Sequence, residues 1–348
     1  MKKLIIMMAA LAACAAAAAQ TTPEEFQARY ERLVRNLGYS GVGIETLLDR
    51  WEEAFPESRD VPVARFNYWL DKSQHSEVVP KGSLRKFLGN APTVSLKDAD
   101  GNDVNYFEEI FFDEEAFGEA MKVSDAQIAA HPDDLRWQYM KITALIGYEK
   151  ESPDMAAAAL KALIERQAKS HPAWTLDGEP VGEDIFQQGV AEYCANLFQI
   201  GSDAAYEYFH DISVRMNKLY PKNPVFLDNI GSWWRAARGD DKQAAKYYQK
   251  ALKLDPEDYA ATQNLRLIER RKAAAGNALA LLFCLIQGTT HWIQLNPENY
   301  FVSFVPVHVN LPGILLADLA AFAGILLLLL IPTFFISKVD PAETVKAE

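Results

Sequence analysis

Apolar residues recur at helical spacing between Asn223 and Asp255. In the first half of this stretch, one helix face would carry the apolar side chains of Phe226, Leu227, Ile230, Trp233, Trp234 and Ala237. A turn sequence, Gly239-Asp240-Asp241, comes next, and a second apolar stripe consists of Ala244, Tyr248, Ala251 and Leu252. Because Pro256 cannot continue a helix, it ends the second one. The pattern therefore predicts two short helices folded back on each other.

These residues also resemble a tetratricopeptide repeat. The resemblance is carried by Ile230-Gly231-x-x-Trp234, Ala244-x-x-x-Tyr248, Ala251 and Pro256. Two departures are Leu227 in the slot of the family's tryptophan and one extra residue between Gly231 and Ala244. An ordinary helical hairpin is the alternative interpretation.

Repeats of this family bind peptides in a groove lined by the first helix of each hairpin. The resemblance implies that Asn229, Ser232 and Arg235 face such a groove. Trp233 is placed with them as a residue expected to be partly exposed, while Trp234 would take the aromatic packing position. The two tryptophans as a pair are expected to belong to the core instead of forming a ligand cage. For the polar residues, ordinary solvated positions are the alternative.

Helical patterns continue through residues 111–272 and predict a solenoid of hairpins similar to tetratricopeptide repeats. Two further hairpins are expected, pairing residues 135–148 with 155–169 and residues 183–200 with 204–220. Prolines that follow His131, His171 and Tyr220 would end helices. A last helix over residues 257–272 would cover the preceding hairpin.

Residues 20–110 predict three helices and a small β-hairpin. Thr22, Pro23 and Glu25 have the spacing of a capping box with proline at the first helical position. Strands are expected at residues 93–96 and 104–107, around the turn-rich segment 98–102. A calcium loop is a weaker alternative for this segment, with the ligands Asp98, Asp100, Asn102 and Glu109. Asp103 stands where that loop requires glycine.

Residues 1–19 have the pattern of a bacterial secretory leader: Lys2-Lys3, an apolar stretch and small residues before Gln20. Cleavage after Ala19 is the first interpretation. The alternative is a lipoprotein signal ending at Cys14, which would then carry lipid.

The composition changes at Ala273. Residues 278–286 are continuously apolar, and residues 314–336 are long enough to cross a bilayer. Residues 276–348 resemble the last membrane segments of FtsX-like permeases of ABC transporters, especially the lipoprotein-releasing kind. The matching residues are Gly276-Asn277, Gln287, Leu295-x-Pro297-Glu298-x-Tyr300, Val305-Pro306-Val307, Ile331-Pro332 and the segment from Ser337 to Ala342. This resemblance implies a permease fragment whose ATP would be hydrolysed by a separate ATPase subunit.

The charges around this tail conflict with the leader. Arg270-Arg271-Lys272 favours a cytoplasmic position by the positive-inside rule, whereas the leader places residues 20–272 outside. The conflict is removed if residues 278–295 do not cross and only residues 311–336 enter the membrane lipid. A further hypothesis is that two coding sequences have been joined near residues 271–276.

The net charge and the search for catalytic motifs limit the functional classes that we expect. The net charge of −12 argues against nucleic acid as a partner. The sequence contains no spaced metal set, phosphate loop or nucleophile motif, so no cofactor, metal or catalytic residue is expected. Cys194 is expected to be a buried structural thiol.

The expected protein is thus a non-catalytic scaffold that binds a protein or peptide in the bacterial envelope. Its N-terminal domain would be periplasmic and its C-terminal helix would lie in the inner membrane. The alternative is the permease fragment fused to a repeat protein.

Overall fold

The computed structural model describes residues 22–294 and the single residue Leu316. The predicted leader, the membrane segment 311–336 and most residues that resemble a permease lie outside these residues. The described chain is mainly helical, with eleven helices and a small antiparallel sheet, which confirms this part of the predicted fold class. It divides into two units, residues 1–264 and residues 265–348.

The first unit begins with three helices that share a small core. They are α2 (Pro23–Leu37), α3 (Ile44–Ala54) and α4 (Asp60–Ser73). The predicted capping box is present, since Thr22 Oγ1 accepts from the Glu25 N–H while the Glu25 carboxylate accepts from the Thr22 N–H. Trp51 lies at the centre of this core and stacks on Phe26, with ring centroids 6.1 Å apart.

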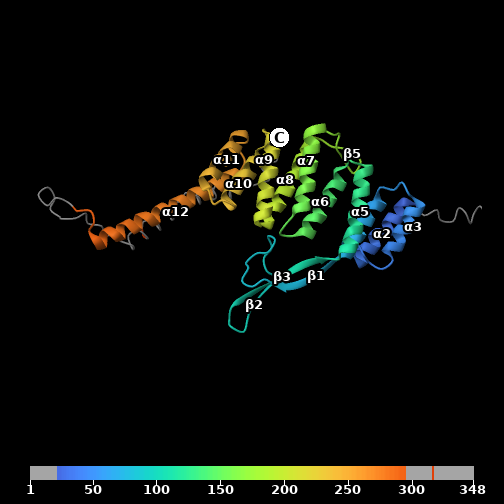
Figure 1. The fold of residues 1–348 in the computed structure, drawn as a ribbon, viewed down its shortest axis with the longest axis horizontal. Coiled ribbons are helices and arrows are strands. Elements are labelled where there is room, and N and C mark those ends of the chain that lie inside the picture. Colours follow the sequence, from blue (N-terminus) through green and yellow to red (C-terminus); the bar gives the residue numbers. More distant parts are fainter. Residues whose placement is uncertain (1–21, 295–315, 317–348) are drawn as a thin grey trace, which may run out of the picture. The chain divides into compact units, whose positions relative to one another are not determined.

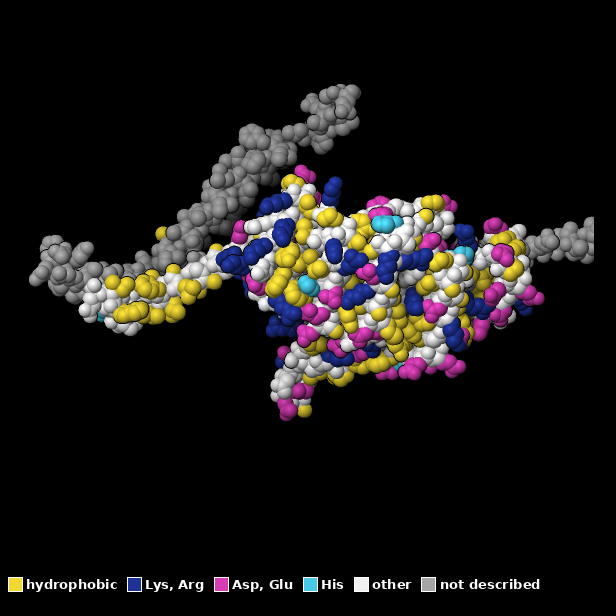
Figure 2. Space-filling model, turned by 45° about the horizontal axis from the view of Figure 1, so that its top comes forward, with side chains coloured by type: hydrophobic (Ala, Val, Ile, Leu, Met, Phe, Trp, Pro, Cys, Tyr) yellow, Lys and Arg dark blue, Asp and Glu magenta, His cyan; other side chains and the backbone are white. Residues whose placement is uncertain are grey.

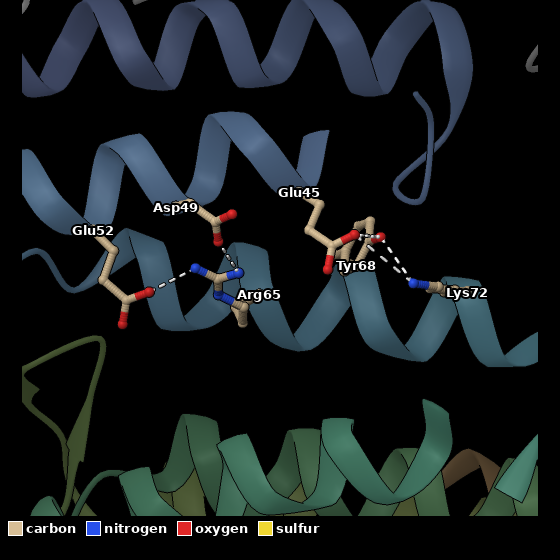
Figure 3. Close-up of polar contacts among 6 residues, drawn as sticks. All are labelled: Glu45, Asp49, Glu52, Arg65, Tyr68 and Lys72. Atoms are coloured by element: carbon tan, nitrogen blue, oxygen red, sulfur yellow. Dashed lines mark hydrogen bonds and ion pairs between the residues drawn. The ribbon is translucent and has the colours of Figure 1, made fainter. Parts of the chain in front are cut away.

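Polar contacts also join α3 to α4 (Figure 3). The Arg65 guanidinium donates to Asp49 Oδ1 at 2.9 Å and to Glu52 Oε2 at 2.6 Å. One turn further along α4, the Tyr68 hydroxyl donates to Glu45 at 2.6 Å and accepts from Lys72 at 3.2 Å. These contacts fix the rotation of α4 relative to α3.

A three-stranded antiparallel sheet follows, in the order β1-β3-β2. Its strands are β1 (Gln74–Pro80), β2 (Val94–Lys97) and β3 (Asp103–Phe112). The predicted hairpin is confirmed as β2 and β3, whereas the first strand, β1, was not predicted. Figure 1 shows the sheet extending from one end of the helices of this unit.

Helices α5 to α11 form the larger part of the unit and lie side by side (Figure 1). They are α5 (Glu114–Ala130), α6 (Leu135–Glu149), α7 (Asp154–Ser170), α8 (Glu183–Ile200), α9 (Asp203–Leu219), α10 (Pro224–Ala236) and α11 (Asp241–Leu254). The predicted hairpins are confirmed as α6 with α7, α8 with α9, and α10 with α11. His131, His171 and Tyr220 each cap the helix that ends before proline.

Neighbouring hairpins also contact each other. Between α7 and α9, Arg215 forms a bidentate ion pair with Glu165, and Lys161 pairs with Asp211. Between α6 and α8, the Tyr193 hydroxyl donates to the Tyr139 carbonyl oxygen at 2.8 Å. One continuous core joins α4 to α10, so the hairpins form a single packed body. A two-stranded hairpin, β4 (Thr175–Leu176) and β5 (Glu179–Pro180), lies in the link between α7 and α8.

The last helix, α12 (Tyr259–Thr290), begins in the first unit and continues into the second. A helix ending at Lys272 was predicted, and this end is wrong. The following residues Ala273-Ala274-Ala275 favour a helix, and no proline interrupts the chain before Thr290. The Gln287 amide binds both the N–H and the carbonyl of Ile293, just after the helix ends.

The second unit, taken by itself, exposes an apolar helix surface. Leu279, Leu282, Phe283 and Leu285 are each about half exposed or more. Figure 2 shows hydrophobic side chains on the surface of this helix. By length and composition, α12 is the one helix in residues 22–294 that could cross a membrane. This helix contains residues 278–286, which were expected not to cross, whereas the expected span 311–336 lies outside the described residues. The helix by itself gives no orientation.

Candidate functional site

Helix α10 carries all four predicted binding residues, and its N-terminus is firmly held. Asn223 is its N-cap: the side-chain Oδ1 accepts from the Val225 N–H at 3.1 Å, and Nδ2 donates to Gln187 of α8 at 3.0 Å. Pro224 occupies the first helical position, where a missing N–H is harmless. The side chains of Phe226 and Ile230 are buried, which fixes the rotation of the helix.

The structure brings three of the four predicted residues together on one side of α10. Ser232 Oγ lies 3.1 Å from the Tyr248 hydroxyl of α11. Arg235 Nη1 donates to Asn264 Oδ1 of α12 at 2.7 Å. Asn229 lies one turn earlier and is half-buried, and its Nδ2 is buried without a hydrogen-bond partner. This surface, which we call the α10 polar face, consists of Asp228, Asn229, Ser232 and Arg235.

The fourth residue, Trp233, does not belong to this face. Its side chain is only 5% exposed, and its ring stacks on His210 of α9 with centroids 3.9 Å apart. Arg238 covers the same ring, with Cζ 4.7 Å from the centroid. The expectation that Trp233 is partly exposed is therefore wrong; Trp234 is the more exposed of the two. The physical reason is that α9 packs against α10 on the side where Trp233 projects.

Asp228 also belongs to the α10 polar face, although no binding role was predicted for it. Its side chain is buried, and its Oδ1 has no hydrogen-bond partner. Burial, followed by a hydrogen bond to Asp258 and by the charges of Asp258 and Asp255, raises the pKa of Asp228 to about 8. This carboxyl group is therefore largely protonated at neutral pH. A signal was present in the sequence, because Asp255 and Asp258 precede the helix that meets α10.

Tyr248 supports the face from behind. It is fully buried, and its ring lies directly against Gly231 of α10. Burial is the main cause that raises the pKa of Tyr248, so its hydroxyl stays protonated as a partner for Ser232. The small residue at position 231 thus lets the two helices approach, and the tyrosine places a hydroxyl under the face.

The functional groups of this face suit recognition by hydrogen bonds. They comprise an amide, a hydroxyl, a guanidinium and a carboxyl group whose raised pKa keeps it largely neutral. Within residues 22–294, no three His, Cys, Asp or Glu side chains are grouped closely enough to hold a metal ion.

The calcium alternative fails on the geometry of the hairpin. Asp98 Oδ1 accepts from the Asp100 and Asn102 N–H groups, so it closes a turn between strands. Glu109, the last ligand required, lies in β3 and pairs with Lys81 and Lys150. Burial alone would raise the pKa of Glu109, but the hydrogen bonds and charges of these two lysines lower it. Both carboxylate oxygens are already bound by the lysines.

The prediction for Cys194 is confirmed. The thiol is fully buried, and burial raises its pKa to about 12. Its Sγ accepts a hydrogen bond from Ser213 Oγ at 3.7 Å, so the thiol serves the packing of the two helices, α8 and α9.

Comparison of the sequence with models of known protein families finds no match, and comparison with curated proteins finds no similar sequence.

Proposed function

We propose that the helical hairpins form a tetratricopeptide-like scaffold that binds a protein or peptide partner through the α10 polar face. The observation that carries this proposal is the pair of buried polar atoms without partners, Asp228 Oδ1 and Asn229 Nδ2. Buried polar atoms are nearly always hydrogen-bonded in folded proteins. Two unpaired atoms on adjacent residues of one face therefore favour a missing ligand.

A peptide backbone has the groups that would complete this site. An N–H group can donate to Asp228 Oδ1, and a carbonyl oxygen can accept from Asn229 Nδ2. Arg235 can release Asn264 to bind a carboxylate or a carbonyl of the partner. Rigid stacking of the hairpins supports this function, because little conformational entropy is then lost on binding.

The proposed location is the bacterial envelope. Residues 273–290 of α12 carry no charged side chain and are apolar enough to lie against a membrane, while the expected span 311–336 would cross it. Together with the predicted leader, this supports a periplasmic helical unit anchored through the C-terminal region. The resemblance to permeases stays a prediction, and no described contact favours transport.

The test is co-purification of the tagged full chain from detergent-solubilised, cross-linked envelopes. Arg235→Glu reverses the charge of the face, while Lys250→Glu makes the same charge change on the exposed side of α11. We expect a specific protein to be recovered with the wild type and with Lys250→Glu, and to fall at least about fivefold with Arg235→Glu. Equal recovery with all three chains would refute binding through this face.

A further inference from the structure

A second candidate site lies near α4, α5 and α6, away from α10, where no binding residue was predicted. A cavity of about 430 Å³ opens between the start of α4, the end of α5, the start of α6 and the β4–β5 hairpin. Its lining includes Arg59, Asp60, Gln127, His131 and Trp137. This volume lies in the range of pockets that hold small molecules.

One wall of the cavity is the β4–β5 hairpin, and several contacts hold it rigidly. Trp174, just before β4, is buried; its Nε1 donates to Gln167 Oε1 at 2.7 Å and its ring stacks on Phe186. The Thr175 N–H donates to the Asp133 carbonyl at 2.9 Å. Asp133 is fixed in turn by Arg166. The wall is therefore present before any ligand arrives, which lowers the entropy lost on binding.

The tip of this hairpin holds two arginines in place. Asp177 and Gly178 form the turn, and both have left-handed backbone conformations, with φ of 59° and 82°. The Asp177 carboxylate pairs with Arg136. The Arg59 guanidinium lies against Gly178, where the Cβ of any other residue would overlap it. The turn thus positions Arg59 without neutralising its charge.

Some polar side chains that line the cavity bind other protein groups, whereas others have no partner among the described residues. Asp177 and Arg136 neutralise each other, and Asp134 caps α6 by accepting from the Arg136 N–H at 3.0 Å. In the described chain, the side chains of Arg59, Asp60, Gln127 and His131 make no hydrogen bond or ion pair. One free guanidinium and one free carboxylate therefore border the same cavity, over the buried indole of Trp137.

The charges of the lining residues indicate which class of ligand this cavity can bind. Two arginines and three aspartates line the cavity, so a phosphate dianion would meet net repulsion. A planar carboxylate matches the fork of Arg59, and an ammonium group matches Asp60. We infer that this cavity binds a small zwitterion of the amino-acid type, with its carboxylate on Arg59, its ammonium on Asp60 and an apolar side chain over Trp137. The inference is independent of the α10 polar face.

Thermal melting of the full chain in detergent, with each of the twenty common L-amino acids, tests the inference. At least one amino acid with an apolar or aromatic side chain should raise the melting temperature, because a ligand that binds only the folded state stabilises it. Calorimetric titration should then show binding at least about tenfold weaker for the matching amine without a carboxylate and the matching acid without an amine. Inorganic phosphate should produce no shift.

Arg59→Gln should weaken binding of the selected amino acid by at least about tenfold. Arg32→Gln, the same change on the exposed surface of α2, should leave it unaltered. If Arg59→Gln does not fold, Arg59→Lys is tested in its place. It should also weaken binding, because lysine keeps the positive charge but lacks the planar guanidinium fork. No shift with any amino acid, equal binding of the one-charge analogues or of phosphate, or full binding by the folded Arg59 variant would each overturn the inference.

Discussion

The ring of Tyr248 lies so close to Gly231 that a Cβ atom at position 231 would be 2.8 Å from Tyr248 Cε1. Tyr248 is fully buried, so its ring has no free space to move into. The closeness of α10 to α11 thus depends on glycine at this position. The same contact places the Tyr248 hydroxyl beside Ser232.

Gly231→Ala should destabilise the protein by about 1–3 kcal/mol, because overpacking outweighs the better helix propensity of alanine. Gly118→Ala in α5 is the matched control, since its new Cβ would meet no atom within 4 Å. The control should be neutral or stabilising by up to about 1 kcal/mol. Urea denaturation followed by tryptophan fluorescence measures both. A stabilised Gly231→Ala protein would contradict the packing described.

Asp228 predicts how the α10 polar face responds to pH. Its pKa rises from 3.8 to about 8 on folding, so the folded state keeps a proton that the unfolded state loses in this range. The stability that it contributes is complete below pH 3.8 and is lost as the pH rises through 8. Asp228→Asn carries no such proton. Its stability relative to the wild type should therefore increase from pH 5 to 7, by up to about 1.4 kcal/mol per pH unit.

Thermal or urea unfolding of both proteins at several pH values measures this difference. Asp211→Asn, at an exposed carboxylate on α9 paired with Lys161, serves as the comparison. A constant difference between Asp228→Asn and the wild type across this range would show that Asp228 is ionised in the folded protein.

Cys194 should be unreactive in the folded protein. Its burial and raised pKa leave almost no accessible thiolate at pH 8. A chain with Cys14→Ser and Cys284→Ser, which retains only Cys194, should react with a thiol reagent after denaturation and not before. The same chain with the added substitution Lys250→Cys, at an exposed position of α11, is the control and should be labelled once without denaturant. Fast labelling of native Cys194 would contradict the packing of α8 on α9.

The ion pairs of Arg65 should make a small, salt-sensitive contribution to the free energy of unfolding. Its fork binds Asp49 and Glu52 together, which the single ammonium of lysine does less well (Figure 3). Arg65→Lys should cost about 0.5–1 kcal/mol at low salt and less at 1 M salt, because both carboxylates are solvent-exposed. Arg32→Lys should have no effect. A loss that does not change with salt would show that packing of the Arg65 stem is the larger effect.

Local signals predicted most of the helices. The capping box at Thr22 and Glu25, and the prolines after His131 and His171, depend on residues within one turn of the helix end. The strand β1 was missed because its partner β3 is distant in the sequence: Gln74 pairs with Phe112. The extension of α12 beyond Lys272 was missed because the change in composition there does not change helix propensity.

The sites show the same division between local and distant signals. Asn229, Ser232 and Arg235 were selected because the resemblance to a tetratricopeptide repeat implies that they face its groove, and residues three apart do share a helix face. The role of Trp233 was not predictable, because it depends on His210 of the neighbouring helix. The cavity of about 430 Å³ is formed by Arg59, His131 and Gly178, which come from three separate segments. Periodicity along one helix carries no information about such a meeting.

Binding of a partner at the α10 polar face is tested most directly by photo-cross-linking in intact cells. A photoreactive phenylalanine analogue is placed at Asn229 or Arg235, on the face, and at Lys250, on the exposed side of α11. We predict one discrete cross-linked protein from positions 229 and 235, identified as the same protein by mass spectrometry, and none from position 250. The absence of a cross-link at both face positions, or the same product from all three, would contradict the scaffold function.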